Sequence, residues 1–421
     1  MPIDLGLSRV IKLLTFLGNP HISSYKSVHI AGTNGKGSTI AYLSLILTQS
    51  RIRNGRFTSP HLVSYNDCIS INDQTYPLSS FEKVRKIVEN QDANFNLGCT
   101  EFEILTATAF KIFEIEKVEL ALIEVGLGGR LDATNALAPW FGQPDSGGVV
   151  VCGITKIGMD HEGFLGNTID AIAREKAGII KQSIPVVVDH TNTREVLDSI
   201  SVKAELEDAH VVSTKVPLGL DLANPIQYSP LLGAYQSQNL SVALHIVEVL
   251  KNRLGLENLT SQFILSGIRN TRWPGRLQKL RDEATGTEFL LDGAHNESAA
   301  VELGKYLSSI RRNGFIFVVA MSEGKSVENL LKHIAVENED AIVPFSFDIP
   351  DEMPWVKCQE TGHIFEISQN FVKDVFEPNL KNVADLFQFI SARRQLGDLR
   401  QIVICGSLYL CAGILRHVRT S

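Results

Sequence analysis

The stretch SVHIAGTNGKGST at residues 27–39 places a glycine-rich turn between a short apolar run and a helical segment. Glycines at such a turn let backbone N–H groups approach phosphate oxygens, and the N-terminus of the following helix adds positive potential. Lys36 supplies a mobile positive charge, and Ser38 or Thr39 supplies a hydroxyl near a metal ion. The spacing is G-x-x-G-K-G-S rather than the common G-x-x-x-x-G-K-[ST], and an ordinary turn between strand and helix is the alternative. We therefore predict a polyphosphate site here, followed by a helix over residues 40–49.

Apolar runs of strand length alternate with helical stretches along the chain. Most of these runs lack polar alternation, as strands buried on both faces do. They are residues 28–30, 120–125, 149–152, 185–188, 289–291, 315–319 and 402–405. Between two of them, residues 101–116 place Phe102, Leu105, Phe110 and Phe113 at helical spacing. We therefore predict an α/β fold with mostly parallel strands and helices on both faces of the sheet.

The chain has 421 residues, which is too long for one ordinary core. The segment TRWPG at residues 271–275 interrupts the pattern, and a new series of strands and helices follows it. We therefore predict one domain over residues 1–272, which carries the phosphate loop, and a smaller α/β domain over residues 273–421. The segment at residues 139–148 is rich in Pro and Gly and predicts a surface loop.

Composition excludes several classes of protein. Hydrophobic residues make up 44% and charged residues 21%, which is typical of a globular chain. The net charge of −7 argues against a general nucleic-acid binder. No apolar run approaches the roughly 20 residues of a membrane span, and the N-terminal segment resembles neither a secretory signal nor a transit peptide. The six cysteines are scattered without a CxxC pair, so we expect reduced thiols in a cytoplasmic protein with no membrane partner.

Four further segments carry residues that could take part in binding or catalysis. Glu124 ends a predicted strand beside a glycine-rich turn, where a carboxylate near a phosphate loop is placed to hold Mg²⁺. His161 follows the next strand as a candidate metal ligand or base, and REKAG at residues 174–178 is a charged helix segment running into a glycine. Asp292 ends a strand of the second domain, so the site is expected to draw on both domains. Taken alone, each segment also has an ordinary explanation, such as a solvated side chain or a loop histidine.

These motifs, taken in order along nearly the whole chain, resemble the folylpolyglutamate synthase/dihydrofolate synthase family, which is related to the Mur ligases. The pattern is most similar to the fungal members that carry dihydrofolate synthase activity alone. The matching segments are IDLGL at 3–7, GTNGKGS at 32–38, TSPH at 58–61, EVGLGGRLDATN at 124–135, DH at 160–161, FLG at 164–166, REKAGI at 174–179, YQ…N at 235–239, WPGR at 273–276, DGAHN at 292–296 and CGSLY at 405–409.

The resemblance implies a P-loop-containing, Mur-ligase-like N-terminal domain and a Rossmann-like C-terminal domain that takes part in glutamate ligation. It implies a ligase that joins L-glutamate to the carboxylate of a pteroate or folate with ATP, through an acyl phosphate. The implied cofactors are ATP, two Mg²⁺ ions, a monovalent cation and a carbamylated Lys176. The implied partners are dihydropteroate, L-glutamate and ATP, with no nucleic acid, and the implied state is a monomer.

The resemblance also assigns roles to individual residues. The residues implied in ATP binding are Gly35, Lys36, Gly37, Ser38, Asn239, Arg276 and Asp292. The implied magnesium ligands are Ser59, Glu124 and His161, and the implied lining of the pterin pocket is Phe102 and Asp132. The implied catalytic residues are Lys36, Lys176 and His295.

The segment after SPHL departs from the family pattern in a way that bears on the acceptor. Asp67 keeps the usual acid, but Cys68 replaces an arginine, and Ser64 stands where another basic residue is common. Because arginine binds the extra carboxylates of folates well, its loss favours dihydropteroate as the acceptor. The alternative explanation is an exposed loop of variable sequence. Rival functions are a folylpolyglutamate synthase or dual-function enzyme and, more distantly, a P-loop ATPase switch.

Overall fold

A computed structural model gives the structure of the protein and describes residues 5–144, 146–350, 353–377 and 380–420. Ile3 and Asp4 of the first motif, and Asp145 of the predicted surface loop, lie outside the described residues. The chain divides at Arg272 and Trp273 into two compact units. Two short segments from the first part of the chain, Leu62–Tyr65 and Leu231–Tyr235, belong to the second unit.

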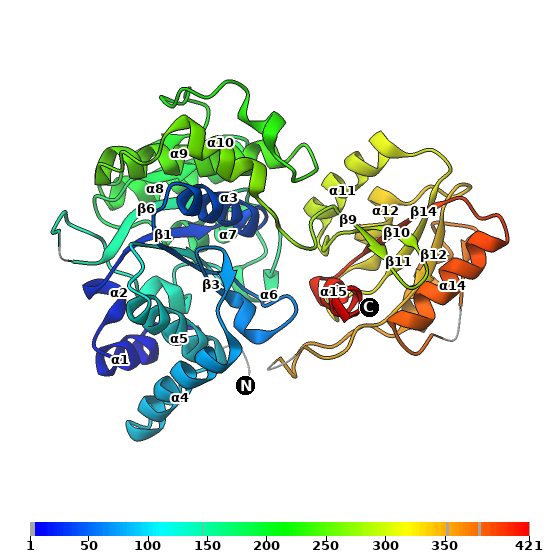
Figure 1. Cartoon of the computed structure of the whole chain (residues 1–421), viewed down its shortest axis with the longest axis horizontal. Coiled ribbons are helices and arrows are strands. Elements are labelled where there is room, and N and C mark those ends of the chain that lie inside the picture. The colour runs from blue at the N-terminus through cyan, green and yellow to red at the C-terminus, as the bar shows by residue number, and fades with distance from the viewer. Residues whose placement is uncertain (1–4, 145, 351–352, 378–379, 421) are drawn as a thin grey trace. The chain divides into compact units, whose positions relative to one another are not determined.

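The N-terminal unit contains an eight-stranded sheet in the order β4-β3-β2-β5-β1-β6-β7-β8 (Figure 1). The strands from β2 to β8 in this order run parallel, and β3 and β4 extend the sheet antiparallel at one edge. The bounds are β1 Lys26–Ala31, β2 Asn54–Phe57, β3 Ile69–Ile71, β4 Gln74–Thr75, β5 Leu120–Glu124, β6 Gly148–Ile154, β7 Val186–Val188 and β8 Val211–Ser213. The central strands β5 and β6 are buried throughout, which explains their continuous apolar runs.

Helices cover both faces of this sheet, with α3, α9 and α10 on one face and α2 and α5 on the other (Figure 1). The bounds are α1 Ser8–Phe16, α2 Pro20–Ser23, α3 Lys36–Gln49, α4 Leu78–Asn94, α5 Glu101–Ile115, α6 Glu162–Leu165, α7 Ile169–Ala177, α8 Arg194–Leu206, α9 Gln236–Leu254 and α10 Ser261–Asn270. Helix α3 is buried from Ser38 to Leu47, because neighbouring helices cover the side that does not face the sheet.

The C-terminal unit contains a six-stranded sheet in the order β13-β12-β11-β14-β10-β9, in which β9 alone pairs antiparallel. The strands are β9 Gln278–Asp282, β10 Thr287–Leu291, β11 Phe315–Val319, β12 Ala341–Pro344, β13 Asp374–Val375 and β14 Gln401–Cys405. The helices are α11 Glu297–Ile310, α12 Val327–Ile334, α13 Thr361–Ser368, α14 Val383–Gln395 and α15 Leu408–Thr420. Alternate residues of β11 enter two separate apolar clusters, Phe315 and Phe317 in one, Ile316 and Val318 in the other, so this sheet is also covered on both faces.

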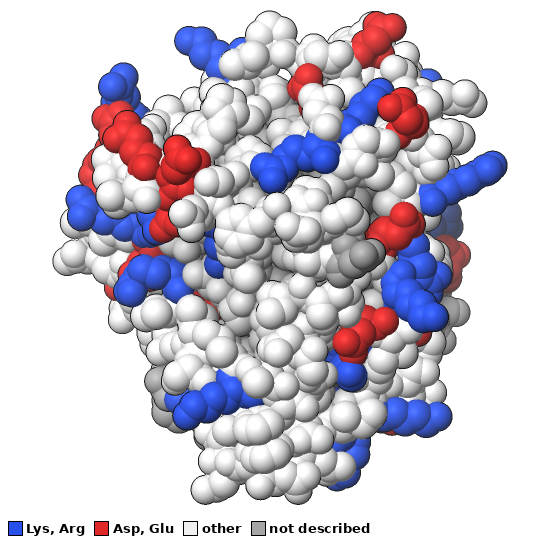
Figure 2. Space-filling view, turned by 90° about the vertical axis from the view of Figure 1, so that its left-hand side faces the viewer, with Lys and Arg blue, Asp and Glu red and all other residues white. Residues whose placement is uncertain are grey.

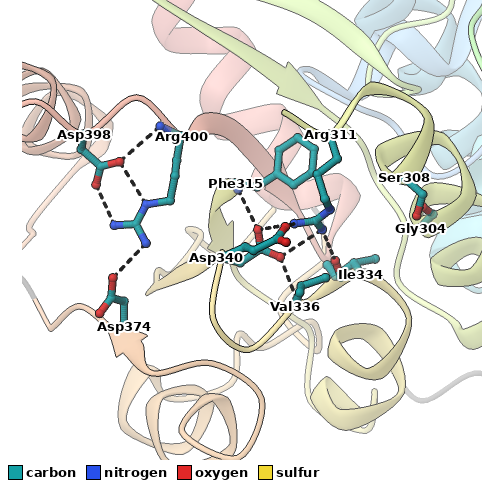
Figure 3. Close-up of polar contacts among 11 residues, drawn as sticks. Gly304, Ser308, Arg311, Phe315, Ile334, Val336, Asp340, Asp374, Asp398 and Arg400 are labelled. Atoms are coloured by element: carbon teal, nitrogen blue, oxygen red, sulfur yellow. Dashed lines mark hydrogen bonds and ion pairs between the residues drawn. The ribbon is translucent and has the colours of Figure 1, made fainter. Parts of the chain in front are cut away.

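A buried carboxylate organises one end of this second sheet (Figure 3). Asp340 accepts hydrogen bonds from Phe315 N at 2.7 Å and Val336 N at 2.8 Å, and it pairs with Arg311 Nη1 at 2.7 Å. The Asp340 side chain is fully buried, so its charge depends on these donors. This network joins the start of β11 to the loop before β12.

The predicted α/β class is confirmed, and each predicted apolar run lies in or overlaps a strand. The helix predicted from Ile40 begins four residues earlier at Lys36, because Gly35 takes a left-handed conformation and forms its N-cap. Strand β2 was not predicted, since Asn54, Gly55 and Arg56 lack an apolar pattern although all three are buried.

The charged side chains on the face seen in Figure 2 are of both signs and interspersed. Among the residues drawn there, no continuous basic field stands out, as the net charge of −7 suggests. In the described part of the chain, every helix falls short of the length and apolar character that crossing a membrane requires.

Candidate active site

The predicted site residues of the N-terminal unit follow four adjacent strands of one sheet. Strands β2, β5, β1 and β6 lie side by side and run parallel, so their carboxyl ends meet at one edge. Ser59 follows β2, Glu124 ends β5, residues 32–35 follow β1, and His161 lies beyond β6. Ligands of open α/β sheets bind at such an edge.

The phosphate loop is shaped by contacts that leave no room for side chains. Gly32 has φ of 152°, and a Cβ there would lie 1.9 Å from Thr155 Oγ1. Gly35 has φ of 93°, and a Cβ there would lie 2.1 Å from Asn239 Oδ1. Gly35 is the N-cap residue of α3 but has no side chain that could accept from the first N–H groups of the helix, so these groups stay suited to an anion.

Lys36 places its ammonium group over this loop. Its Nζ donates to Gly32 O at 3.0 Å and lies 3.8 Å from Glu124 Oε1. Both side chains are largely buried, with 15% of Lys36 and 8% of Glu124 exposed. A cation and a carboxylate therefore stand side by side where β1 and β5 end.

The first turn of α9 packs against the loop from a position some 200 residues away in sequence. Thr39 Oγ1 donates to Asn239 O at 3.3 Å, and Gln236 Nε2 donates to Ser38 Oγ at 3.4 Å. Asn239 Nδ2 donates in turn to Gln236 Oε1 at 3.1 Å. The structure thus brings the predicted residues Gly35, Ser38 and Asn239 together. Gln236 was not among the predicted residues.

Lys176, on α7, contacts the same loop. It is 4% exposed, and its Nζ donates to Gly32 O at 3.1 Å, the carbonyl that also accepts from Lys36. Burial, and then the charge of Lys36, lower the pKa of Lys176 to about 7, although the carboxylates of Asp160 and Asp132 oppose this. A substantial fraction of this amine is therefore uncharged near neutral pH.

The predicted magnesium ligands share the sheet edge. The His161 side chain is 45% exposed, with Nε2 lying 3.9 Å from Asp160 Oδ2, and its backbone N–H donates to Asp160 Oδ1 at 2.9 Å. Among the residues that the structure describes, no group of three or more His, Cys, Asp and Glu side chains is arranged to hold a metal ion. The predicted set of Ser59, Glu124 and His161 contains only two such side chains, so it stays a prediction.

Phe102 and Asp132 both contact the short loop that follows β5. A Cβ at Gly126 would lie 2.4 Å from Phe102 Cζ, so the ring rests directly on this glycine. Asp132 is 1% exposed and accepts from Leu127 N at 2.8 Å and Thr134 N at 3.0 Å. Burial raises the pKa of the Asp132 carboxyl, while these hydrogen bonds oppose the shift. Asp132 therefore fixes the shape of the loop, and little of its own surface is open.

The predicted residues of the C-terminal unit lie around one turn of that unit. Asp292 accepts from Leu277 N and Ala294 N at 2.8 and 2.9 Å, and His295 Nδ1 lies 2.8 Å from Gly293 O. A Cβ at Gly293 would lie 2.7 Å from Arg276 Nη1. Burial raises the pKa of the Asp292 carboxyl, and the charge of Arg276 opposes this.

A glycine-rich loop, an acidic residue and two lysines at the edge of a parallel sheet are features of α/β proteins that bind nucleotide polyphosphates. Residues 276–417 match the family model described as dihydrofolate synthetase, C-terminal domain. The chain is 39% identical over 434 residues to a dihydrofolate synthetase of Saccharomyces cerevisiae, covering 99% of this chain and 98% of that protein. It is 37% identical over 436 residues to a probable dihydrofolate synthetase of Schizosaccharomyces pombe, covering 100% and 99%.

Solved structures agree with these sequence matches. A folylpolyglutamate synthase of Mycobacterium tuberculosis complexed with ADP has a TM-score of 0.78 and 26% identity, covering 98% of this chain and 94% of that chain. The chain belongs to the dihydrofolate synthase/folylpolyglutamate synthase family of ligases, as its motifs indicated.

Proposed function

We propose that this protein is a dihydrofolate synthase, which joins L-glutamate to 7,8-dihydropteroate and converts ATP to ADP and phosphate. The observation that carries the proposal is its similarity, over the full chain, to dihydrofolate synthetases of two fungi. The loop formed by Gly32, Gly35 and Lys36 supplies the phosphate-binding geometry that this reaction needs.

The chemistry requires activation of a carboxylate, which has no good leaving group. Transfer of the γ-phosphoryl group to the carboxylate of dihydropteroate gives an acyl phosphate. The amine of glutamate then attacks the carbonyl carbon, and phosphate leaves as the amide forms. In this proposal, Gly35, Lys36, Gly37 and Ser38 hold the ATP phosphates, and Lys36 neutralises charge on the transferred group.

The proposal assigns further roles to residues in both units. Asn239, Arg276 and Asp292 contact the nucleotide, and His295 serves catalysis. Phe102 and the loop fixed by Asp132 form a wall for the pterin ring of the acceptor. Support for the wall comes from the contact of Phe102 with Gly126, which joins the start of α5 to the loop after β5.

Glu124 and Ser59, at the sheet edge, offer oxygen donors that fit magnesium. A carboxylate, a hydroxyl and phosphate oxygens are hard donors of the kind that Mg²⁺ prefers. Glu124, Ser59 and His161 would hold it, and bound Mg²⁺ would neutralise charge on the phosphates. The contact between Glu124 and Lys36 at 3.8 Å supports this role, because a carboxylate there already faces positive charge.

Carbamylation of Lys176 is also part of the proposal. The uncharged amine attacks carbon dioxide, an N–C bond forms, and a proton is released to solvent. The pKa of about 7 provides the uncharged amine, and burial beside Lys36 penalises the ammonium form. The ammonium form of Lys176 repels the charge of Lys36, whereas the negatively charged carbamate attracts it.

The acceptor is predicted to be dihydropteroate rather than a folate. Cys68 is 1% exposed, so an exposed, freely varying loop does not explain the loss of arginine at this position. Arg56, a buried arginine on β2, donates to Asp73 Oδ1 in the β3–β4 turn at 2.8 Å and to Ser70 Oγ on β3 at 3.0 Å, so its guanidinium is paired at this edge of the sheet. Since Cys68→Arg would force a long charged side chain into a buried position, acceptor comparison with the wild type is the cleaner test.

The experiment measures phosphate release and amide product with ATP and L-glutamate, using dihydropteroate or tetrahydrofolate as the acceptor. We expect product from dihydropteroate with a kcat/KM at least about tenfold higher than that for tetrahydrofolate, since a missing bidentate contact is typically worth this much. Comparable values would identify a dual-function enzyme. A rate of phosphate release that is the same with and without either acceptor would favour an ATPase switch.

A further inference from the structure

A buried histidine lies in the strand that leads to the phosphate loop. His29, on β1, is fully buried three residues before Gly32. Its Nε2 lies 2.9 Å from Thr134 Oγ1, whereas its Nδ1 has no hydrogen-bond partner among the described residues. A buried nitrogen without a hydrogen-bond partner destabilises the folded state, so packing alone does not explain a histidine at this position.

The direction of the hydrogen bonds follows from the donors available. The Thr134 hydroxyl has one proton, which it donates to Asp132 Oδ1, because a carboxylate only accepts. Thr134 Oγ1 must then accept from His29, so the imidazole carries its proton on Nε2. Burial, and then the charge of Lys181, lower the pKa of His29 well below its ordinary value, so the ring is neutral. The hydrogen-bond chain therefore runs from His29 through Thr134 to Asp132.

This chain continues to the wall proposed for the acceptor. Asp132 Oδ2 accepts from Leu127 N at 2.8 Å, and Gly126, the preceding residue, supports the ring of Phe102. One end of the chain thus belongs to the strand that carries the phosphate loop. The other end belongs to the loop on which Phe102 rests.

We propose that His29 and Thr134 are positioning residues that hold the acceptor wall in register with the phosphate loop. The inference rests on the proposed function, in which Phe102 and the loop fixed by Asp132 contact the pterin ring. Transfer of a phosphoryl group requires the acceptor carboxylate to lie within contact distance of the γ-phosphate, and small misplacements reduce the rate strongly. Removing a link of the chain should therefore weaken use of the acceptor and leave ATP binding unchanged.

The test uses His29→Leu, which removes the N–H donor and also the unpaired Nδ1. We expect KM for dihydropteroate to rise about tenfold, as for loss of a hydrogen bond in a network that ends on a charged group, while KM for ATP stays within about twofold. A role in packing alone predicts the opposite pattern, because an apolar residue suits this site: stability at least equal to wild type and both KM values unchanged. Ser27→Ala is the matched control, since Ser27 lies on the same strand with a buried hydroxyl that has no partner in the described part of the chain.

Two conservative variants and one further disruptive variant keep the test decisive if His29→Leu fails to fold. His29→Gln retains an N–H donor and Thr134→Ser retains the hydroxyl, so both should keep KM for dihydropteroate near the wild-type value. Thr134→Val removes the hydroxyl at nearly constant shape and should raise KM for dihydropteroate. Variants that leave this KM unchanged, or raise both KM values equally, overturn the inference alone. A wild type that uses neither dihydropteroate nor tetrahydrofolate overturns the proposed function, and this inference with it.

Discussion

Lys176 should destabilise the unmodified protein at neutral pH, and Lys176→Met should relieve this cost. Lys176 is 4% exposed, and its pKa lies at about 7 instead of 10.5. At about 1.4 kcal/mol for each pKa unit, that difference amounts to about 5 kcal/mol of unfavourable free energy while the ammonium form persists. The same substitution removes the amine that carbamylation needs, so we expect a more stable protein that no longer ligates glutamate.

The sign of the pH dependence follows from proton binding. Below about pH 7 both the folded and the unfolded states hold the proton on Lys176, so the full cost is present. Between about pH 7 and 10.5 the unfolded state binds more protons, and the free energy of unfolding of the wild type therefore rises with pH. The advantage of Lys176→Met should fall from about 5 kcal/mol at pH 6 to about 2 kcal/mol at pH 9.

Urea unfolding of the N-terminal unit, measured from pH 6 to 9 with and without bicarbonate, checks this expectation. Bicarbonate should stabilise the wild type and leave Lys176→Met unchanged, because only the wild type can form the carbamate. Lys181→Met is the matched control: Lys181 is a second, partly buried lysine, burial lowers its pKa to about 8, and its Nζ contacts Asn135 instead of the phosphate loop. That variant should keep activity and the response to bicarbonate. A Lys176→Met protein that is less stable than wild type at every pH would refute the reasoning.

Three further predictions concern single residues. Lys36→Ala should lower kcat for ligation by about 10³-fold or more with the fold intact by circular dichroism, since charge stabilisation is the main catalytic device; a variant that keeps a tenth of the activity would contradict this role. His161→Ala should raise the Mg²⁺ concentration needed for half-maximal activity, and an unchanged Mg²⁺ titration would return His161 to the ordinary loop histidines. Asp340→Ala should destabilise the C-terminal unit by about 3–5 kcal/mol in urea unfolding, because Arg311 and two backbone N–H groups would lose their buried partner; a loss below about 1 kcal/mol would show that these donors find other acceptors.

The α/β class could be predicted from sequence because its strands are buried on both faces. Residues 315–319 form β11 with the predicted bounds, and residues 149–152 lie inside β6. Strand β2 escaped prediction because burial of Asn54 and Arg56 depends on partners elsewhere in the fold. Asn54 pairs with Ser44, and Arg56 pairs with Asp73, and local sequence carries no signal of either contact.

The local part of the site could also be predicted, since glycines, a lysine and a carboxylate follow strands at recognisable spacing. Contacts between residues far apart in the sequence could not be predicted. Thr155 touches Gly32, and Gln236 reaches Ser38, only because the sheet and α9 bring them to the loop. His29 is the clearest case: its partner Thr134 is 105 residues away, and in the sequence it looks like one polar residue inside an apolar strand.

The central claim is that ATP activates the carboxylate of dihydropteroate for attack by glutamate. The most direct measurement uses dihydropteroate with ¹⁸O at both oxygens of that carboxylate and follows the label into inorganic phosphate and dihydrofolate by mass spectrometry. The account predicts one labelled oxygen in each phosphate released, in step with formation of dihydrofolate. Unlabelled phosphate, or phosphate release without amide formation, would contradict it.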